Sequence, residues 1–514
     1  MVKNVRDARN ASAKVRPGVL ALVNDVLPPV DAMVEDLLFI RAALERADIG
    51  FMLVRGNDER PVLVVDIADS ERLRATFVED MAREPFLLKT EGKKAGPAVL
   101  VADGLLSLGR KDRSFVVYRP RVSSAGGLRY GAASGVRMEL WAFGDTIIEA
   151  PKESALTRRT LPRTELIEST VERYGVEWRT IESMFATLSS DVTFDIDMVF
   201  SWVDGTDIEF QRARARRMQS YVVGEGDDHE ARFRQLDELR YALRSVHVFA
   251  PWVRRIFIVT DSPTPHWLTE QPKVTVVRSE DFFVDPSVLP THNSHAVESQ
   301  LHHIPGIAEH FLYSNDDMFF GRPVTPDMFF SPGGVTKFVE ATTRIGLGGT
   351  TPQRSGFENA ARVNRGLLAD RFGVTITRHL EHCAAPLTRA VLLELEKEFP
   401  EDFARTAASR FRASTDVSVT NSLYHYYALL TGRAVIQEHA KVRYVDTTMR
   451  HGLVAMEKLL AKRNVDMFCL NDGSFPEISA EERAAAVGTF LENYFPIVAP
   501  WETNFESVEH SHAI

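Results

Sequence analysis

The chain has only two cysteines among its 514 residues, Cys383 and Cys469, so a disulfide framework is excluded. It also has no run approaching the roughly 18–20 apolar residues that a membrane-spanning helix requires. The N-terminal segment is basic, but Asn24 and Asp25 interrupt its apolar run, which makes it a poor signal peptide. We therefore expect a cytoplasmic protein. The basic arm is best read as a solvated tail, and a peripheral association with the inner membrane stays open.

Positive charge is also scarce. Lysine and arginine number 61 against 71 aspartates and glutamates, which gives a formal net charge of -10. This balance argues against a protein that binds nucleic acid through bulk electrostatics. A protein of this charge that handles an anionic substrate needs local arginines, lysines or a metal ion. The hydrophobic content of 44% and the length are typical of a soluble globular protein with two to four domains.

Several familiar catalytic motifs are missing. The sequence contains no P-loop, no GxSxG, no Rossmann GxGxxG and no kinase signature. It also lacks HExxH and any cysteine or histidine cluster with the spacing of a structural zinc site. The remaining candidates are carboxylates at strand ends and scattered arginines, which fit a metal-assisted transfer on a nucleotide-sugar.

The pattern of apolar and polar residues divides the chain into four segments. Residues 1–150 predict a small α+β accessory domain, in which capped amphipathic helices and short β-rich runs carry no catalytic cluster. Residues 151–190 are charged and predict a helical connector. Residues 191–500 predict the catalytic domain, and residues 501–514 a tail.

In the third segment, apolar runs alternate with helical segments. This order predicts βαβ units, and so an α/β fold with a mostly parallel Rossmann-like (GT-A-like) catalytic domain with helical additions. Ligands of such sheets bind beyond the carboxyl ends of the strands. Polar clusters stand at three of these ends: Asp204-Gly205, Thr260-Asp261 and Asn315-Asp316-Asp317.

The stretch LYSNDDMFF at 312–320 places two adjacent carboxylates in apolar surroundings, where an unpaired charge is costly. Successive side chains of a strand point to opposite faces, so Asp316 and Asp317 share a direction only if the chain turns there. Carboxylate oxygens in such a turn suit a hard divalent cation, and an Asx turn or helix cap is the alternative. Asp472 follows a second apolar run and could supply a further carboxylate.

Histidines also occur in suggestive positions. A helix capped by Asn293 or Ser294 would place His295, Glu298 and His302 on one face, which suits either a sugar pocket or the zinc site of a metallohydrolase. Elsewhere, His379 and His382 are spaced i, i+3, and one of them could act as a general base or both could be structural.

Arginines accompany carboxylates in two further segments. Arg234 and Asp237 lie near the start of a predicted helix, where contact with a phosphate or a sugar hydroxyl is plausible, and Glu238 follows them. Arg412 and Asp416 precede another helix, and arginine is the usual bidentate partner of phosphate.

Four blocks of the sequence resemble the conserved regions of the Stealth family. They are DMVFSWVDGTD at 197–207, a long block from 232 to 324, a third from 382 to 416, and CLND at 469–472. The family comprises bacterial capsule polysaccharide phosphotransferases, and its animal relative is the lysosomal-enzyme N-acetylglucosamine-1-phosphotransferase. The resemblance spans roughly residues 195–475 and leaves the N-terminal segment uncovered.

This resemblance implies a hexose-1-phosphate transferase of capsule or exopolysaccharide synthesis. A UDP-sugar would be the donor, a hydroxyl of a glycan the acceptor, UMP the leaving product, and Mg²⁺ or Mn²⁺ the cofactor. Two rivals stay open: a GT-A-like glycosyltransferase that releases UDP, and a catalytically silent glycan-binding protein. The sequence does not determine the hexose, the acceptor or whether the chain forms a homodimer.

The resemblance also assigns roles to individual residues. It implies metal ligation by Asp316, Asp317 and Asp472; nucleotide contacts by Trp202, Asp204 and Gly205; donor-sugar contacts by Asn293, Ser294, Glu298, Arg234, Asp237 and Glu238; and catalysis by Asp317, His382 and Arg412. Animal members carry a second histidine where this chain has Ala385, so the base could also be His379 or Asp317. They also have asparagine at the position of Asp204.

Overall fold

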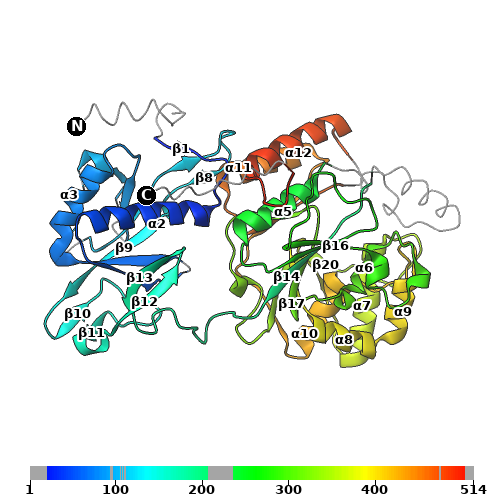
Figure 1. The fold of residues 1–514 in the computed structure, drawn as a ribbon. Helices are drawn as coiled ribbons and strands as arrows, with labels where there is room; N and C mark the ends of the chain where they lie inside the picture. Colours follow the sequence, from blue (N-terminus) through cyan, green and yellow to red (C-terminus); the bar gives the residue numbers. More distant parts are fainter. Residues whose placement is uncertain are drawn as a thin grey trace. The chain divides into compact units, whose positions relative to one another are not determined.

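The computed structural model describes residues 20–503, apart from residues 59, 93–95, 105, 107, 109–111, 206–235 and 474–475. The chain forms two compact units, Met1–Leu188 and Ser189–Ile514 (Figure 1). Among the helices of the described residues, none combines the length and the apolar character that a membrane crossing requires.

The N-terminal unit is built around a mixed sheet. Its elements are β1 (Leu22–Val23), α2 (Pro29–Arg46), β2 (Phe51–Arg55), β3 (Pro61–Asp66), α3 (Ser70–Asp80), β4 (Leu87–Thr90), β5 (Val99–Leu100), β6 (Ser114–Tyr118), β7 (Arg121–Val122), β8 (Arg129–Tyr130), β9 (Val136–Phe143), β10 (Ile147–Glu149) and β11 (Thr160–Pro162). The strand order is β11-β10-β9-β6-β4-β5, and β3 joins β9 and pairs with β2. Strands β2 and β3, two of the short β-rich runs predicted in this segment, pair in antiparallel orientation.

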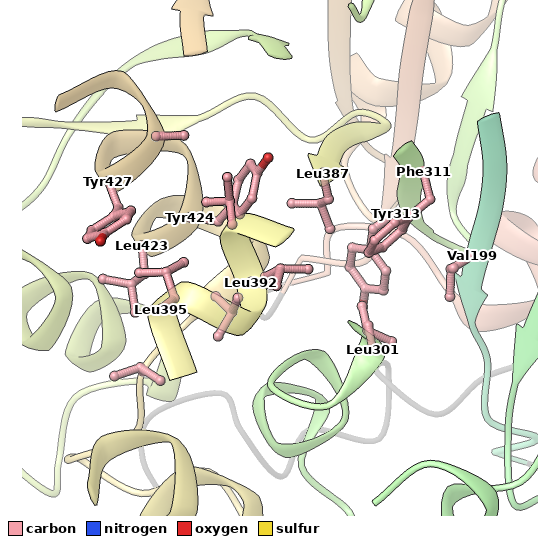
Figure 2. Packing of buried hydrophobic residues seen from close by; sticks show 14 of the residues in the cluster. Val199, Leu301, Phe311, Tyr313, Leu387, Leu392, Leu395, Leu423, Tyr424 and Tyr427 are labelled. Carbon is pink, nitrogen blue, oxygen red and sulfur yellow. The ribbon is translucent and has the colours of Figure 1, made fainter. Parts of the chain in front are cut away.

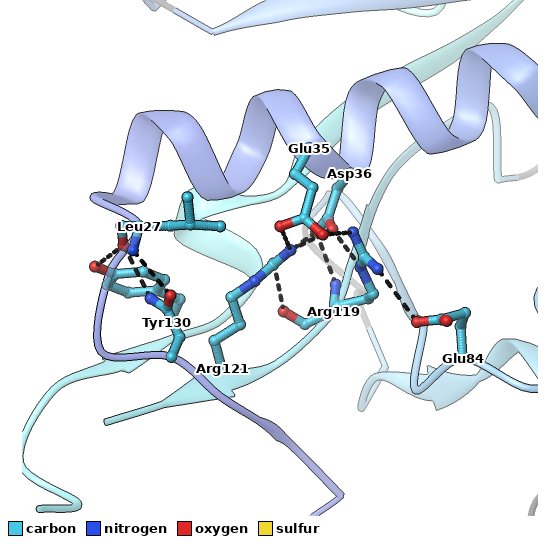
Figure 3. A network of polar contacts seen from close by, with 8 residues as sticks. Leu27, Glu35, Asp36, Glu84, Arg119, Arg121 and Tyr130 are labelled. Carbon is cyan, nitrogen blue, oxygen red and sulfur yellow. Dashed lines mark hydrogen bonds and ion pairs between the residues drawn. The ribbon is translucent and has the colours of Figure 1, made fainter. Parts of the chain in front are cut away.

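A buried ionic network fastens α2 to the end of β6 (Figure 3). The carboxylate of Asp36, which is fully buried, accepts hydrogen bonds from Arg119 Nε at 2.6 Å and Arg121 Nη2 at 2.8 Å. Glu35 accepts from the same two arginines at 2.8 and 3.2 Å. Removing one partner of a buried pair typically costs about 3–5 kcal/mol, because the other charge is left uncompensated. These buried charges therefore have a structural role, which is to stabilise the N-terminal unit.

The helical interpretation of residues 151–190 is wrong, because this segment contains strands. Strands β12 (Glu168–Arg173) and β13 (Val176–Ile181) pair in an antiparallel hairpin. Tyr174 and Gly175 connect them with φ values of 55° and 75°, the backbone that a tight hairpin turn requires. Buried and exposed side chains also alternate along the first part of β13. The many charged residues mark the exposed face of a hairpin here, and not a solvated helix.

The second unit contains a five-stranded sheet. Its strands are β14 (Ile196–Ser201), β15 (Ile256–Val259), β16 (Val274–Val277), β17 (His310–Asn315) and β22 (Ala385–Thr388). They are ordered β16-β15-β14-β17-β22; the first four are parallel and β22 is antiparallel to β17. This arrangement confirms the prediction of a mostly parallel α/β sheet.

Further short strands and helices complete this unit. The strands are β18 (Met318–Phe320), β19 (Thr336–Phe338), β20 (Glu340–Arg344), β21 (Arg378–Leu380), β23 (Ala434–Ile436), β24 (Val442–Asp446) and β25 (Met467–Asn471). The helical segments are α5 (Glu238–Phe249), α6 (Ser294–Glu298), η8 (Leu301–His303), α7 (Gly356–Phe372), α8 (Arg389–Glu398), α9 (Pro400–Ala408), α10 (Tyr424–Leu430), α11 (Arg450–Lys462) and α12 (Ala480–Tyr494). Strand β25 pairs with β18 and β24, so residues 316–317 turn the chain from the central sheet into this smaller one.

A continuous apolar cluster connects the central sheet to the surrounding helices (Figure 2). Val199 of β14, Phe311 of β17 and Leu387 of β22 belong to it, together with Leu392 of α8 and Tyr424 of α10. All five are fully buried, and burying a side chain of this size contributes about 1.5–3 kcal/mol. This packing fixes the position of β17, the strand whose carboxyl end carries the acidic stretch.

Candidate active site

The parallel strands of the central sheet end together. Ser201 at the end of β14 is paired in register with Val259 of β15 and with Asn315 of β17. The loops that follow these strands therefore begin at one edge of the sheet, where ligands of parallel α/β sheets bind. Asp261, in the loop after β15, accepts a hydrogen bond from the Ser279 backbone N–H at 2.8 Å and fixes the local turn.

Four carboxyl groups gather at this edge. Asp316 and Asp317 form the turn between β17 and β18, and the Leu470 backbone N–H donates to the Asp317 carbonyl at 2.9 Å, which docks the turn on β25. Asp472 directly follows β25, and Glu238 opens α5. The three predicted metal ligands thus lie together, and Glu238 joins them although its predicted place was beside the donor sugar. We call these four residues the acidic cluster.

Burial and mutual repulsion perturb the acidic cluster. Burial raises the pKa of Asp317 to about 7, and the charges of Glu238 and Asp472 add to this shift. The pKa of Asp316 lies well above its usual range because of burial and the neighbouring Asp317. As whole residues, both aspartates are half-buried and not sealed in the core. Carboxyl groups that are strongly perturbed are typical of functional sites.

Arg483 of α12 orients one member of the acidic cluster. Its buried guanidinium forms an ion pair with Asp472, and its Nη2 lies 3.7 Å from Glu238 Oε1. Its Nε donates to Thr447 Oγ1 at 2.8 Å, and Thr447 Oγ1 lies 2.8 Å from Asp472 Oδ1. Arg483 therefore neutralises part of the cluster and holds the Asp472 carboxylate in place.

The residues of the acidic cluster fit a divalent cation. Cys469 Sγ donates to Asp317 Oδ2 at 3.4 Å, but among the described residues no donor reaches the buried Oδ1 of Asp317. A buried carboxylate oxygen without a donor is costly, and further carboxylates beside it increase the cost. Hard cations such as Mg²⁺ and Mn²⁺ prefer such oxygen ligands.

A second polar group lies beside Tyr313 of β17. Glu298 at the end of α6 is buried and accepts a hydrogen bond from Thr420 Oγ1 at 2.7 Å, with the Tyr313 hydroxyl 3.5 Å from its other oxygen. Burial raises the pKa of Glu298 to about 7, although these contacts and Arg412 oppose the shift. Burial also raises the pKa of Tyr313, with contributions from Glu298 and Asp316. Tyr313 is therefore close both to Glu298 and to the acidic cluster.

Arg412 provides the positive charge near Glu298. Its Nη2 donates to Ser294 Oγ in the first turn of α6 at 2.8 Å. The start of α7 packs closely on its aliphatic stem, since a Cβ at Gly356 would lie only 2.6 Å from the Arg412 Cβ. This contact explains the glycine and restrains the arginine. A guanidinium held in this way is suited to bind a phosphate group.

Asn293 fixes the start of α6 and is itself engaged in internal contacts. Its Oδ1 accepts from the His295 backbone N–H at 3.1 Å, and its Nδ2 donates to Asp416 Oδ2 at 2.8 Å. Helix α6 ends at Glu298, and His302 belongs to the separate segment η8. The predicted single helical face with His295, Glu298 and His302 is therefore wrong, and so is the zinc site drawn from it.

The two candidate bases lie in β21 and the loop that follows it. The His379 ring stacks on Phe357 with a centroid distance of 4.6 Å, and the His382 ring meets Tyr444 edge-on at 5.2 Å. Burial lowers the pKa of both histidines, which favours the neutral imidazole needed for a base. Tyr444 pairs in register with Cys469, whose thiol contacts Asp317, so His382 is the histidine that contacts a neighbour of the acidic cluster.

The remaining predicted residues follow β14 or precede α5. The buried Trp202 donates its backbone N–H to the Val259 carbonyl at 3.1 Å, and the Asp204 N–H donates to Ser262 Oγ at 2.9 Å. Gly205 is buried, whereas Asp237 is exposed at the N-terminus of α5 with a φ of 58°. Arg234 lies outside the described residues.

Sequence reasoning missed Arg483, Tyr313, Thr420 and the thiol contact of Cys469. Arg483 occurs in a charged amphipathic helix, where an arginine is usually solvated, and Tyr313 and Cys469 occupy strand positions that also suit core residues. Only the folding of distant segments onto the carboxyl end of β17 reveals their contacts. No signal in the sequence distinguishes them.

Comparisons with known proteins match this unit to one family. Models of the Stealth protein conserved regions CR1, CR2, CR3 and CR4 match residues 194–222, 232–338, 381–429 and 457–511. The exopolysaccharide phosphotransferase CpsY of Mycobacterium tuberculosis (strain ATCC 25618 / H37Rv) is 59% identical over 95% of this chain and 91% of its own length. The exopolysaccharide phosphotransferase of Nocardia farcinica is 54% identical over 92% of this chain and 88% of its own length.

More distant similarities also occur. An exopolysaccharide phosphotransferase of Streptomyces coelicolor, SCO6023, is 35% identical over 94% of this chain and 84% of its own length. Among solved structures, the galactosyltransferase LgtC in complex with donor and acceptor sugar analogues matches 59% of this chain and 96% of its own, with 12% identity and a TM-score of 0.29.

Proposed function

Since the chain belongs to the Stealth family and is a transferase of phosphorus-containing groups, we propose that it moves a hexose 1-phosphate from a UDP-sugar to a hydroxyl of an acceptor glycan. The relatives are named exopolysaccharide phosphotransferases, so the product would be part of a capsule or exopolysaccharide. In this reaction the acceptor oxygen bonds to the β-phosphorus and the bond from that phosphorus to the bridging oxygen breaks. UMP leaves with the electron pair, and the hydroxyl proton passes to a base.

The observation that carries this proposal is the presence of buried carboxyl groups and a restrained arginine, both near Tyr313 of β17. Tyr313 is close enough to feel the charges of Asp316, a member of the acidic cluster, and of Glu298 and Arg412. Phosphoryl transfer depends mainly on positioning and on neutralising charge on the phosphate oxygens. Asp316, Asp317 and Asp472 would hold Mg²⁺ or Mn²⁺, which when bound supplies positive charge to the diphosphate.

The side chains of this unit would divide the remaining work. Arg412, restrained by Ser294 and Gly356, would bind the phosphate that is transferred. Glu298 and Thr420, whose side-chain oxygens are hydrogen-bonded to each other, would bind hydroxyls of the donor sugar. His382 would accept the hydroxyl proton, since its lowered pKa keeps it neutral near pH 7.

The residues after β14 would bind the nucleotide. Trp202 offers an indole N–H that has no partner among the described residues, and Asp204 begins the loop beyond the strand. Asp237, exposed at the start of α5, would contact the donor sugar. We further propose a cytoplasmic location, which suits a protein whose two cysteines are both free.

Identification of the nucleotide product tests this function. The full chain is incubated with Mg²⁺ or Mn²⁺, a panel of UDP-sugars and oligosaccharide acceptors, and the products are separated by chromatography. Stoichiometric UMP and acceptor-linked phosphate are expected, whereas UDP as the nucleotide product would refute the proposal and favour a glycosyltransferase. Asp317→Asn should abolish transfer. Asp370→Asn, at an exposed position of α7, removes the same charge away from the site and should retain it.

A further inference from the structure

A second group of potential metal ligands lies away from the acidic cluster. His302 and His303 of η8 and Glu396 of α8 each offer one ligand atom, and these atoms lie within 4.8 Å of one another. His302 Nε2 is 3.1 Å from Glu396 Oε2, and His303 Nε2 is 3.0 Å from the same oxygen. We propose that these three residues bind a zinc ion, with water as a fourth ligand.

The distances are close to those of a tetrahedral site. Zinc lies about 2.0–2.1 Å from imidazole nitrogen and carboxylate oxygen, so neighbouring ligands of a regular tetrahedron are about 3.3–3.4 Å apart. The carboxylate oxygen of Glu396 would need to move away from the two nitrogens by only a few tenths of an ångström. Two imidazoles and one carboxylate form a ligand set that zinc uses in proteins when it keeps one open position.

The orientation of the histidines is unusual for adjacent residues. Successive side chains of a 3₁₀ segment point about 120° apart, since such a helix has three residues per turn. Here the rings of His302 and His303 lie with centroids 4.0 Å apart, and both direct Nε2 to one carboxylate. His302 is fully buried, while the side chains of His303 and Glu396 are 23% and 27% exposed. An ion can therefore enter from the solvent side.

The surrounding contacts hold the ligands in this arrangement without the ion. Arg389 Nε at the start of α8 donates to the His302 carbonyl at 2.9 Å, and the ring of His302 packs edge-on against Phe403. Burial, the charge of His303 and the charge of Arg389 lower the pKa of His302, while its bond with Glu396 opposes them. Burial raises the pKa of Glu396, but its histidine hydrogen bonds outweigh this and bring it to about 2. Neutral imidazole and ionised carboxylate are the forms that bind zinc.

The site is distinct from the acidic cluster in position and in chemistry. The Arg389 backbone N–H donates to the Glu309 carbonyl at 2.9 Å, and Thr388 pairs with His310, the first residue of β17. The acidic cluster lies beyond the last residue of the same strand. Oxygen ligands favour Mg²⁺ or Mn²⁺, whereas imidazoles favour zinc, so the two sites would select different ions. Zinc would fasten the segment that enters β17 to α8.

Zinc binding by the full chain tests this proposal. Protein stripped with EDTA is transferred to buffer with excess Mg²⁺, and zinc affinity is measured by competition with a chromophoric chelator. One tight equivalent is expected, with a higher Tm and, for Co²⁺, the absorption of a tetrahedral site. His303→Ala and Glu396→Gln should each weaken binding at least 100-fold and remove the Tm increase. His439→Ala, which removes an exposed histidine elsewhere, should change neither.

The Asp317→Asn variant distinguishes a failure of the zinc proposal from a failure of the proposed transfer reaction. The variant should lose transfer and still bind one zinc ion with unchanged affinity. Zinc binding that is lost in Asp317→Asn but retained in both site variants would overturn the proposal and place the ion in the acidic cluster. The absence of a tight equivalent in the wild-type chain would overturn it as well. Circular dichroism establishes that the variants are folded.

Discussion

Asp317→Asn should have opposite effects on activity and on stability at alkaline pH. The carboxyl of Asp317 has a pKa of about 7 in the folded protein against an ordinary value of 3.8. The folded state therefore binds a proton more tightly than the unfolded state does, and stability falls as pH rises from about 4 to about 7. At about 1.4 kcal/mol for each pKa unit, ionising this residue costs the metal-free protein about 4 kcal/mol by pH 8.

The asparagine variant removes this cost but introduces an amide. Asparagine can still accept the Cys469 thiol at one oxygen, while its buried NH₂ group could lack a partner at a cost of about 1–3 kcal/mol. The net difference at one pH is therefore smaller than 4 kcal/mol. Its change with pH depends on the carboxyl alone. Relative to wild type, the variant should gain about 4 kcal/mol between pH 4 and pH 8.

Urea denaturation of both proteins in EDTA at several pH values measures this change. A chain with two units need not unfold in one step. Hydrogen exchange of peptides from the second unit therefore follows the unfolding of that unit alone. Adding Mn²⁺ at pH 8 should stabilise the wild type more than the variant. A difference in stability that stays constant from pH 4 to pH 8 would show that Asp317 is not held in the environment described here.

Three further predictions concern other residues of the candidate active site. Arg483→Met should lower the free energy of unfolding by about 3–5 kcal/mol at pH 8. The loss should be smaller at pH 5, because Glu238 and Asp317 have raised pKa values and gain protons there. A loss that is independent of pH in urea titrations would contradict the contact of Arg483 with the acidic cluster. Arg412→Lys keeps the charge but not the planar fork, so kcat/KM for transfer should fall about 10–100-fold, and an unchanged value would exclude phosphate contact. His382→Ala should remove the acidic limb of the pH–rate profile while His379→Ala retains it, and the reverse result would exchange their roles.

The carboxylates of the acidic cluster could be picked out from the sequence in part. Asp316 and Asp317 stood at a predicted strand end, where ligands of parallel sheets bind. Their approach to Asp472 depends on β18, which follows them and pairs antiparallel with β25 in a separate sheet. The resemblance to the Stealth family assigned Glu238 to the donor sugar, but the start of α5 brings it close to Asp316 and Asp317. Arg483 could not be found in this way, since its role depends on a helix that folds back from the end of the chain.

Predictions from local sequence patterns were also wrong where one composition is compatible with two different structures. The charged residues of 151–190 are as compatible with an exposed hairpin as with a helix, and the Tyr174-Gly175 turn decides between them. The spacing of His295, Glu298 and His302 suits one helical face only if the helix continues, and it ends at Glu298. The pairing of His302 with Glu396 joins residues 94 positions apart, so no local pattern could predict it.

The fate of the β-phosphorus tests the proposed reaction most directly. A UDP-sugar labelled at the β-phosphorus is incubated with the chain, Mg²⁺ and an acceptor glycan, and the label is traced after separation of glycan and nucleotide. Transfer of a sugar 1-phosphate predicts that the label moves to the glycan in a phosphodiester and that the nucleotide is unlabelled UMP. Label recovered in UDP, with an unlabelled glycan product, would contradict it.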